Sequence, residues 1–135
     1  MHVAVREKKN SVQAVRWLQS AAENGNTAAM LQLGKLYRSG VGVLQNFDRS
    51  AKWTQTAAAR GNAEGMLELG RLYRDGIGFE KSPARAYVWF NRAAAMHNLD
   101  AVREREDIAR TLTVEELKKA QNQSSEAETT SGASD

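Results

Sequence analysis

Three tryptophans spaced 36 residues apart place the strongest constraint on the fold. Trp17, Trp53 and Trp89 coincide when the chain is aligned with itself at that offset. Residues 14–49 and 50–85 then share sixteen identical pairs. Self-similarity at a fixed period is typical of repeat architectures, in which each unit packs mainly against its neighbours. The 135-residue chain is therefore predicted to be one domain built from repeats.

Each unit is predicted to be a pair of helices. Apolar residues recur at the i, i+3, i+4, i+7 and i+8 spacing of one helix face, and a second apolar stripe follows a Gly-Asn pair. In the first unit the two stripes comprise Ala14, Trp17, Leu18, Ala21 and Ala22, and then Met30, Leu33, Gly34 and Tyr37. A content of 41% hydrophobic and 26% charged residues, with a single proline, agrees with an all-α chain.

Glycines occupy two kinds of position in this pattern. Gly34 and Gly70 lie inside the second helix, where glycine costs about 1 kcal/mol relative to alanine, so a close approach by another helix is expected there. The second helix then ends at glycine pairs, which should turn the chain into the next unit: Gly40 with Gly42, and Gly76 with Gly78. A phosphate-binding glycine loop is disfavoured because no predicted strand precedes these pairs.

The second unit carries the repeat motif in full. Its positions are Ala51, Lys52, Trp53, Ala57, Ala58, Gly61, Asn62, Met66, Leu69, Gly70, Tyr73, Gly76, Ile77 and Gly78. This pattern resembles the Sel-one-like repeat family, a relative of the tetratricopeptide repeats. The resemblance implies an αα-superhelix of three 36-residue helix-turn-helix repeats plus a C-terminal capping helix. It also implies a scaffold for protein complexes, with a concave face lined mainly by the first helix of each unit.

The resemblance covers residues 10–121 and sets the expected boundaries. They are repeats at 10–45, 46–81 and 82–112, a capping helix at 113–121, a remnant of a preceding repeat loop within 1–9, and a flexible acidic tail at 122–135. Thr113 and Glu116 form the capping box that should start the closing helix. The segment 112–121 resembles the closing segment of bacterial members, which favours a bacterial origin.

The third unit departs from the motif. His97 replaces the glycine that follows the first helix, and Arg105-Glu106 replaces the Leu-Gly pair. A terminal repeat is expected to be atypical, because one of its faces meets water. The second helix of this unit, 101–110, is therefore predicted to be a polar lid.

A ligand-binding face is predicted by analogy with tetratricopeptide repeats. The candidate positions on the first helices are Leu18, Gln19, Thr54, Gln55, Tyr87, Phe90 and Asn91, with Arg16, Lys52 and Arg92 as an electrostatic rim. An amide recurs in every unit and suits an extended peptide backbone, because it offers a donor and an acceptor. Tyr87 and Phe90 fit either an aromatic anchor in the groove or core beneath the terminal lid.

No set of residues indicates catalysis, a metal ion or a cofactor. The chain has no cysteine, and His2 and His97 lie far apart without a metal-binding spacing. The carboxylates Glu104, Glu106 and Asp107 are expected on the exposed lid rather than in a pocket. No apolar run is long enough for membrane insertion. Without a signal peptide the sequence predicts a soluble cytoplasmic protein, or a periplasmic one if a leader has been removed.

Two alternatives to protein binding stay open. The chain carries a net charge of +3 and an acidic end, so its body is basic and favours an acidic protein or a nucleic acid. Arg38, Arg74 and Arg110 recur at the repeat spacing and could track a phosphate backbone. They also close helices, where they complement the helix dipole, and this structural role disfavours nucleic acid. The other alternative is self-assembly through an uncovered N-terminal hairpin.

Overall fold

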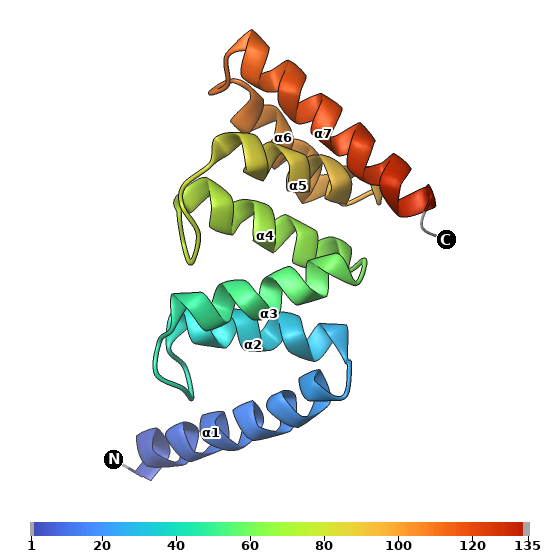
Figure 1. Cartoon of the computed structure of the whole chain (residues 1–135). Coiled ribbons are helices and arrows are strands. Elements are labelled where there is room, and N and C mark those ends of the chain that lie inside the picture. The colour runs from blue at the N-terminus through green and yellow to red at the C-terminus, as the bar shows by residue number, and fades with distance from the viewer. Residues whose placement is uncertain (1, 134–135) are drawn as a thin grey trace.

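The described part of the chain is a stack of seven α-helices. The computed structural model describes the backbone of residues 2–133 and the side-chain environment of residues 10–124. The helices are α1 (His2–Glu23), α2 (Thr27–Ser39), α3 (Phe47–Ala59), α4 (Ala63–Asp75), α5 (Pro83–Ala95), α6 (Leu99–Ala109) and α7 (Val114–Ala133). They follow one another along the stack, with α1 at one end and α6 and α7 at the other (Figure 1). Three hairpins and a closing helix confirm the predicted all-α solenoid.

Side-chain caps define where the helices begin. Asn26, Asn62 and Asn98 stand before α2, α4 and α6, and each amide oxygen accepts a hydrogen bond from the backbone N–H three residues later, at 2.7–2.9 Å. Asn46 and Ser82 cap α3 and α5 in the same way. Such a cap contributes about 1 kcal/mol, because it satisfies a backbone donor that the helix leaves free. The caps therefore fix the repeat locally, before any packing is considered.

The turns inside the hairpins share one backbone geometry. Gly25 and Gly61 have φ angles of +93° and +90°, a region that favours glycine. His97 takes φ +65° at the third turn. The prediction that His97 replaces the turn glycine is therefore confirmed, and the third hairpin keeps the same turn.

The glycines inside the second helices mark the closest helix contacts. A Cβ atom on Gly34 would overlap the Thr54 hydroxyl of α3, and one on Gly70 would lie 2.5 Å from ring carbons of Phe90 in α5. Ser50 of α3 also donates a hydrogen bond to the carbonyl oxygen of Gly34 at 2.7 Å. The predicted close approach is confirmed, because each glycine accommodates a side chain from the next hairpin.

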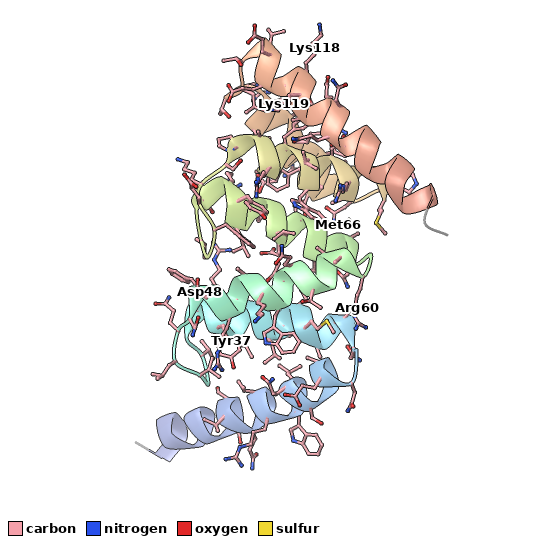
Figure 2. The ribbon with its side chains drawn as sticks, in the orientation of Figure 1. Tyr37, Asp48, Arg60, Met66, Lys118 and Lys119 are labelled. Atoms are coloured by element: carbon pink, nitrogen blue, oxygen red, sulfur yellow. The ribbon has the colours of Figure 1, made fainter. Side chains whose placement is uncertain are left out.

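The buried core divides into two clusters at α3. Ala57 belongs to the cluster formed with α1 and α2, and Ala58 belongs to the cluster formed with α4 to α7. Tyr37 belongs to the first cluster (Figure 2). Its hydroxyl accepts a hydrogen bond from Arg49 of α3 at 3.3 Å. Adjacent alanines thus let one helix pack tightly on both sides.

The terminal helices extend beyond their predicted boundaries. Helix α1 begins at His2, although a loop remnant was expected within residues 1–9, and α7 continues to Ala133, past the boundary at residue 121. Neither extension contains a proline or glycine before residue 132, and adding a residue to an existing helix costs far less than starting one. Residues 134–135 of the expected tail lie outside the described residues.

Candidate protein-binding surfaces

Three of the predicted groove residues are buried in the stack. Thr54 is 3% exposed and Phe90 is 0% exposed, because they pack against the helix-interior glycines of the preceding hairpin. Tyr87 is buried where α7 packs on α5, and Gln121 of α7 donates a hydrogen bond to its hydroxyl at 3.4 Å. The prediction that these side chains face a ligand is therefore wrong. Of the two roles weighed for Tyr87 and Phe90, the structure supports the core role.

The predicted amide series is only partly available to a ligand. Gln19 donates a hydrogen bond to Glu23 on its own helix at 2.9 Å. Asn91 accepts one from Arg105 of α6 at 3.1 Å. Gln55 is exposed, so one amide of the three remains fully accessible.

The other predicted positions are distributed over the same helices. Leu18 is half-buried and packs against the first core cluster. Arg16 and Lys52 are exposed, as a rim requires. Arg92 is half-buried, with its guanidinium 4.5 Å from the centre of the Trp89 ring. An exposed polar strip on α1 and α3 thus remains, formed by Arg16, Lys52 and Gln55 together with the half-buried Gln19.

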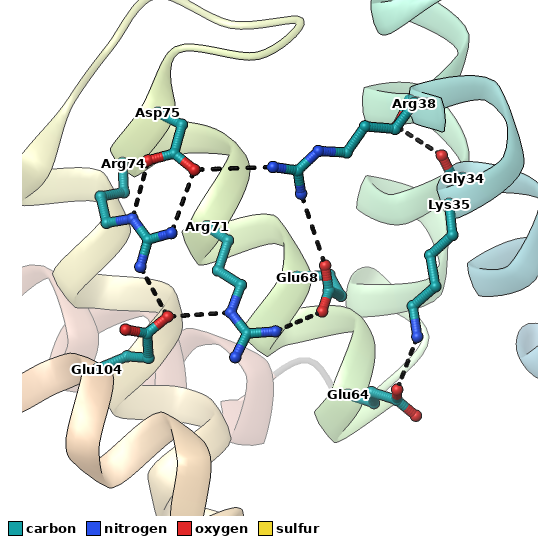
Figure 3. A network of polar contacts seen from close by, with 10 residues as sticks. Gly34, Lys35, Arg38, Glu64, Glu68, Arg71, Arg74, Asp75 and Glu104 are labelled. Carbon is teal, nitrogen blue, oxygen red and sulfur yellow. Dashed lines mark hydrogen bonds and ion pairs between the residues drawn. The ribbon is translucent and has the colours of Figure 1, made fainter. Parts of the chain in front are cut away.

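A network of charged side chains joins the second helices of the hairpins (Figure 3). We call it the α2/α4/α6 network. Its cations are Lys35, Arg38, Arg71 and Arg74, and its carboxylates are Glu64, Glu68, Asp75 and Glu104. Every member is a side chain from α2, α4 or α6, so the network spans all three hairpins.

Glu104 is the carboxylate that ties α6 to α4. It accepts hydrogen bonds from Arg74 at 2.7 Å and from Arg71 at 2.9 Å. Burial by itself would lower the pKa of Arg71, but the hydrogen bond to Glu104 and the charge of Glu68 outweigh burial and raise it. Glu104 is half-buried, so the prediction that it lies on an exposed lid is wrong. The carboxylate turns inward because two guanidinium groups compensate its charge there.

Arg38 is held much less tightly. Its guanidinium lies 3.9 Å from Glu68 and 3.7 Å from Asp75, distances longer than those of strong charge-assisted hydrogen bonds. The side-chain hydrogen bond from Arg74 lowers the pKa of Asp75. Asp75 is therefore already engaged by Arg74, and Arg38 keeps capacity for another anion.

The sequence contained a signal for this network that single-residue inspection misses. Arg38 pairs with Glu68, and Arg74 pairs with Glu104, which are the same two positions one repeat later. Opposite charges that recur together at the repeat spacing indicate a contact between neighbouring units. Only the cations of this pattern were identified from the sequence, as a possible phosphate ladder.

Trp17 differs most from its equivalents in the other repeats. Trp53 and Trp89 are half-buried and pack against the two core clusters, whereas Trp17 is 78% exposed. Trp17 belongs to the apolar stripe predicted for the first helix, yet its side chain is not covered in the structure. Trp17 lines a surface hollow of about 580 Å³ together with Gln13, Arg16 and Ser20.

Within the described residues, no group of three or more histidines or carboxylates is arranged to hold a metal ion. Over the same part of the chain, none of the helices has the length and apolar character required to cross a membrane.

Comparison with known families identifies the repeats. The model described as "Sel1 repeat" matches residues 7–26, 27–62 and 63–98, well over half of the chain. The chain belongs to the Sel1 repeat family. Proteins of this family generally mediate protein–protein interactions. The family unit begins at residues 27 and 63, so its first helix is α2 or α4, whereas the boundaries drawn from the sequence began each unit at α1, α3 or α5.

Solved structures support the same assignment. A protective antigen with an SLR fold from uropathogenic Escherichia coli strains has a TM-score of 0.84 and 31% identity, over 87% of this chain and 25% of that one. A Sel1 repeat protein from Oxalobacter formigenes has a TM-score of 0.66 and 32% identity, over 70% of this chain and 39% of that one. Cysteine rich protein B of Helicobacter pylori has a TM-score of 0.62 and 25% identity, over 65% of this chain and 66% of that one.

All three structures come from bacteria, which is consistent with the bacterial origin favoured by the closing segment. This Sel1 repeat chain spans about a quarter and about two fifths of the lengths of the first two. A search of the curated proteins found no significant match.

Proposed function

We propose that this Sel1 repeat chain is a non-enzymatic protein-binding module whose ligand contacts the α2/α4/α6 network. The resemblance implies that the concave face is lined by the first helix of each unit, and the family unit begins at α2 and α4. The expected binding face therefore moves from α1, α3 and α5 to the neighbouring helices. The burial of Thr54, Tyr87 and Phe90 supports the same change.

The weakly held guanidinium of Arg38 is the observation that carries this proposal. Its two carboxylate neighbours lie at 3.7–3.9 Å, so a carboxylate of a partner can form a shorter, bidentate pair without breaking a strong contact. Lys35 extends the positive end of the network along α2 and forms an ion pair with the exposed Glu64 at 2.9 Å. The ligand is therefore a peptide segment or protein surface that carries an acidic side chain.

The same network disfavours a polyanion as the ligand. Arg74 is paired with Asp75 and Glu104, and Arg110 is paired with Asp107. A phosphate backbone would meet carboxylates between the arginines, and like-charge repulsion opposes tight binding. Affinity for a random oligonucleotide should therefore be weak at moderate salt concentration.

Matched charge removals on the two faces test the proposal. The full chain is immobilised, a captured protein is identified, and its affinity is measured for Arg38→Gln and for Lys52→Gln. Each variant removes one positive charge from a side chain that is exposed or nearly so, so both should keep the stability of the parent. Losing one charge-assisted contact should weaken binding by about tenfold or more in Arg38→Gln only. Loss in Lys52→Gln alone would instead favour the strip on α1 and α3.

A further inference from the structure

The loop between α2 and α3 presents large apolar side chains to solvent. Leu44 is 91% exposed and Val41 is 48% exposed, and Phe47, the first residue of α3, is 44% exposed. We call these three residues the apolar loop patch. Single exposed apolar residues are normal on a protein surface, whereas several that gather on one short segment indicate an interaction site.

The repeat fold itself places this segment in solvent. The loop between α4 and α5 is equivalent, and the two loops project from the same side of the stack (Figure 1). Glu80 occupies the position of Leu44 in the second loop and is also exposed, although a hairpin lies on either side of it. Because a glutamate satisfies the fold at this position, leucine is not required there for packing. Its apolar character is therefore available for contact with a partner.

Hydrogen bonds hold the apolar loop patch at the end of α2 that carries Arg38. The side-chain amide of Gln45 donates to the carbonyl oxygen of Arg38 at 2.8 Å. The next backbone N–H, that of Asn46, donates to the carbonyl oxygen of Tyr37 at 2.8 Å. Two residues of the patch directly flank this Gln-Asn pair, one on each side. The patch and the Arg38 guanidinium therefore belong to the same end of α2.

The next repeat shows the kind of surface that this arrangement forms. Pro83 and Arg74 are equivalent to Phe47 and Arg38, and both line one surface hollow of about 420 Å³. In that hollow Arg74 donates a hydrogen bond to Glu104 at 2.7 Å. The carboxylates paired with Arg38 lie at 3.7–3.9 Å. The first repeat therefore combines a bulkier apolar side chain with a guanidinium that can still bind a closer carboxylate.

We propose that the partner presents a peptide segment in which an acidic residue pairs with Arg38 and neighbouring large apolar side chains cover the apolar loop patch. This assignment rests on the proposed function, because that function places an acidic side chain at Arg38. Lys35 lies about one turn before Arg38, on the side away from the loop. The apolar residues of the ligand therefore lie on the opposite side of its acidic residue from Lys35.

Other occupants of the apolar loop patch fit less well. Residues 122–135 of the chain are acidic but contain no large apolar side chain that could cover a leucine and a phenylalanine. Asp48 follows Phe47 directly and is exposed, and Glu80 is exposed on the neighbouring loop. An anionic lipid surface would repel these two carboxylates. A peptide segment needs only the contacts with Arg38 and the patch.

Selection from a library of random peptides displayed on phage, with the immobilised full chain as bait, tests this ligand class. We expect the enriched peptides to combine Asp or Glu with Leu, Ile, Phe or Trp within a few positions. An enriched peptide is then synthesised, and its affinity is measured by isothermal titration calorimetry for the parent chain, Leu44→Ser, Leu99→Ser and Arg38→Gln. Leu99 is the matched control, because it is 78% exposed at the start of α6. Equal thermal midpoints check that these surface substitutions leave the fold intact.

Leu44→Ser should weaken binding about tenfold, because the peptide loses the burial of one leucine. Leu99→Ser should bind like the parent, and Arg38→Gln should also bind about tenfold more weakly. Enriched peptides without large apolar residues, or equal affinity of Leu44→Ser and the parent, would overturn this ligand class and leave the proposed function intact if Arg38→Gln still weakens binding. Unchanged binding in Arg38→Gln would instead refute the proposed function, and this ligand class with it.

Two further measurements test the other occupants. The parent chain should not sediment with vesicles of phosphatidylcholine and phosphatidylserine, and its sedimentation coefficient should not rise with concentration. Vesicle binding or self-association that is lost in Leu44→Ser would show that the apolar loop patch contacts lipid or a second copy of the chain. Either result would overturn the proposal.

Discussion

Replacing Gly70 by alanine should destabilise the protein, although alanine is the better helix former. In an exposed helix the change stabilises by about 1 kcal/mol. Here the added methyl group would lie 2.5 Å from two ring carbons of Phe90, which is fully buried. Overpacking of this kind typically costs about 1–3 kcal/mol. We therefore expect Gly70→Ala to lower the free energy of unfolding by about 1 kcal/mol.

Removing the ring should reverse the sign of that effect. Phe90→Ala alone should cost about 3–5 kcal/mol, because it loses a buried aromatic side chain and leaves a cavity. In that background the methyl group of Gly70→Ala enters the vacated volume, and the helix-propensity gain of about 1 kcal/mol remains. The two substitutions should therefore be coupled by about 2 kcal/mol or more.

Urea unfolding of the parent, the two single variants and the double variant, followed by far-ultraviolet circular dichroism, measures this coupling. The free energy of unfolding must fall with urea concentration at the same rate in all four proteins, so that differences in the unfolding midpoint report differences in stability. If Phe90→Ala does not fold, Phe90→Leu serves as the smaller perturbation. The reasoning would be refuted if Gly70→Ala changed stability equally in both backgrounds, or if it stabilised the parent protein.

Three further measurements test the packing and the charges. Trp53→Ala should lower the free energy of unfolding by about 3 kcal/mol, because this side chain packs on the first core cluster. Trp17 is exposed, so Trp17→Ala should change it by less than about 0.5 kcal/mol, and equal losses of the two variants in urea unfolding would contradict this difference. Glu104→Gln should lower the free energy of unfolding by about 1–2 kcal/mol, because it weakens two charge-assisted hydrogen bonds. Glu106 is exposed, so Glu106→Gln should leave stability nearly unchanged, and a similar thermal midpoint for both variants would contradict the stabilising role of Glu104. The folded-state pKa of Asp75 lies below its unfolded value, so its stabilising contribution is present above about pH 4 and is lost as the pH falls through the folded pKa. Asp75→Asn should therefore reduce the fall of the thermal midpoint at acid pH, and an unchanged dependence of the midpoint on pH would count against the pKa shift.

The boundary of the repeat unit explains why three of the predicted groove residues are buried and why we propose a different ligand face. A sequence period of 36 residues identifies equivalent positions but does not say which helix comes first in the unit. Counting from Trp17 placed the candidate groove on α1, α3 and α5, and three of its residues are buried there. The family unit starts at Thr27, one helix later, and that difference moves the expected ligand face to another side of the stack.

Contacts between units explain most of the other differences. Phe90 was left between groove and core because its burial depends on Gly70 of the preceding hairpin. Tyr87 is covered by α7, a helix about 30 residues further along the chain. The carboxylate of Glu104 was expected in solvent because its two arginine partners lie 30 and 33 residues away.

The sequence by itself determined the local structure of this protein: the helical hairpin, its asparagine and serine caps, the His97 turn, and the small residues that permit close packing. These features depend on interactions within a few residues of each position, so they repeat wherever the motif repeats. Only the tertiary structure decided which of the equivalent faces is covered. Trp17 and Trp53 stand at the same position of nearly the same motif, yet Trp53 has the α1–α2 hairpin to pack against and Trp17 has no such neighbour within the described residues. Burial depends on the element across the interface, and the repeat motif does not encode that neighbour.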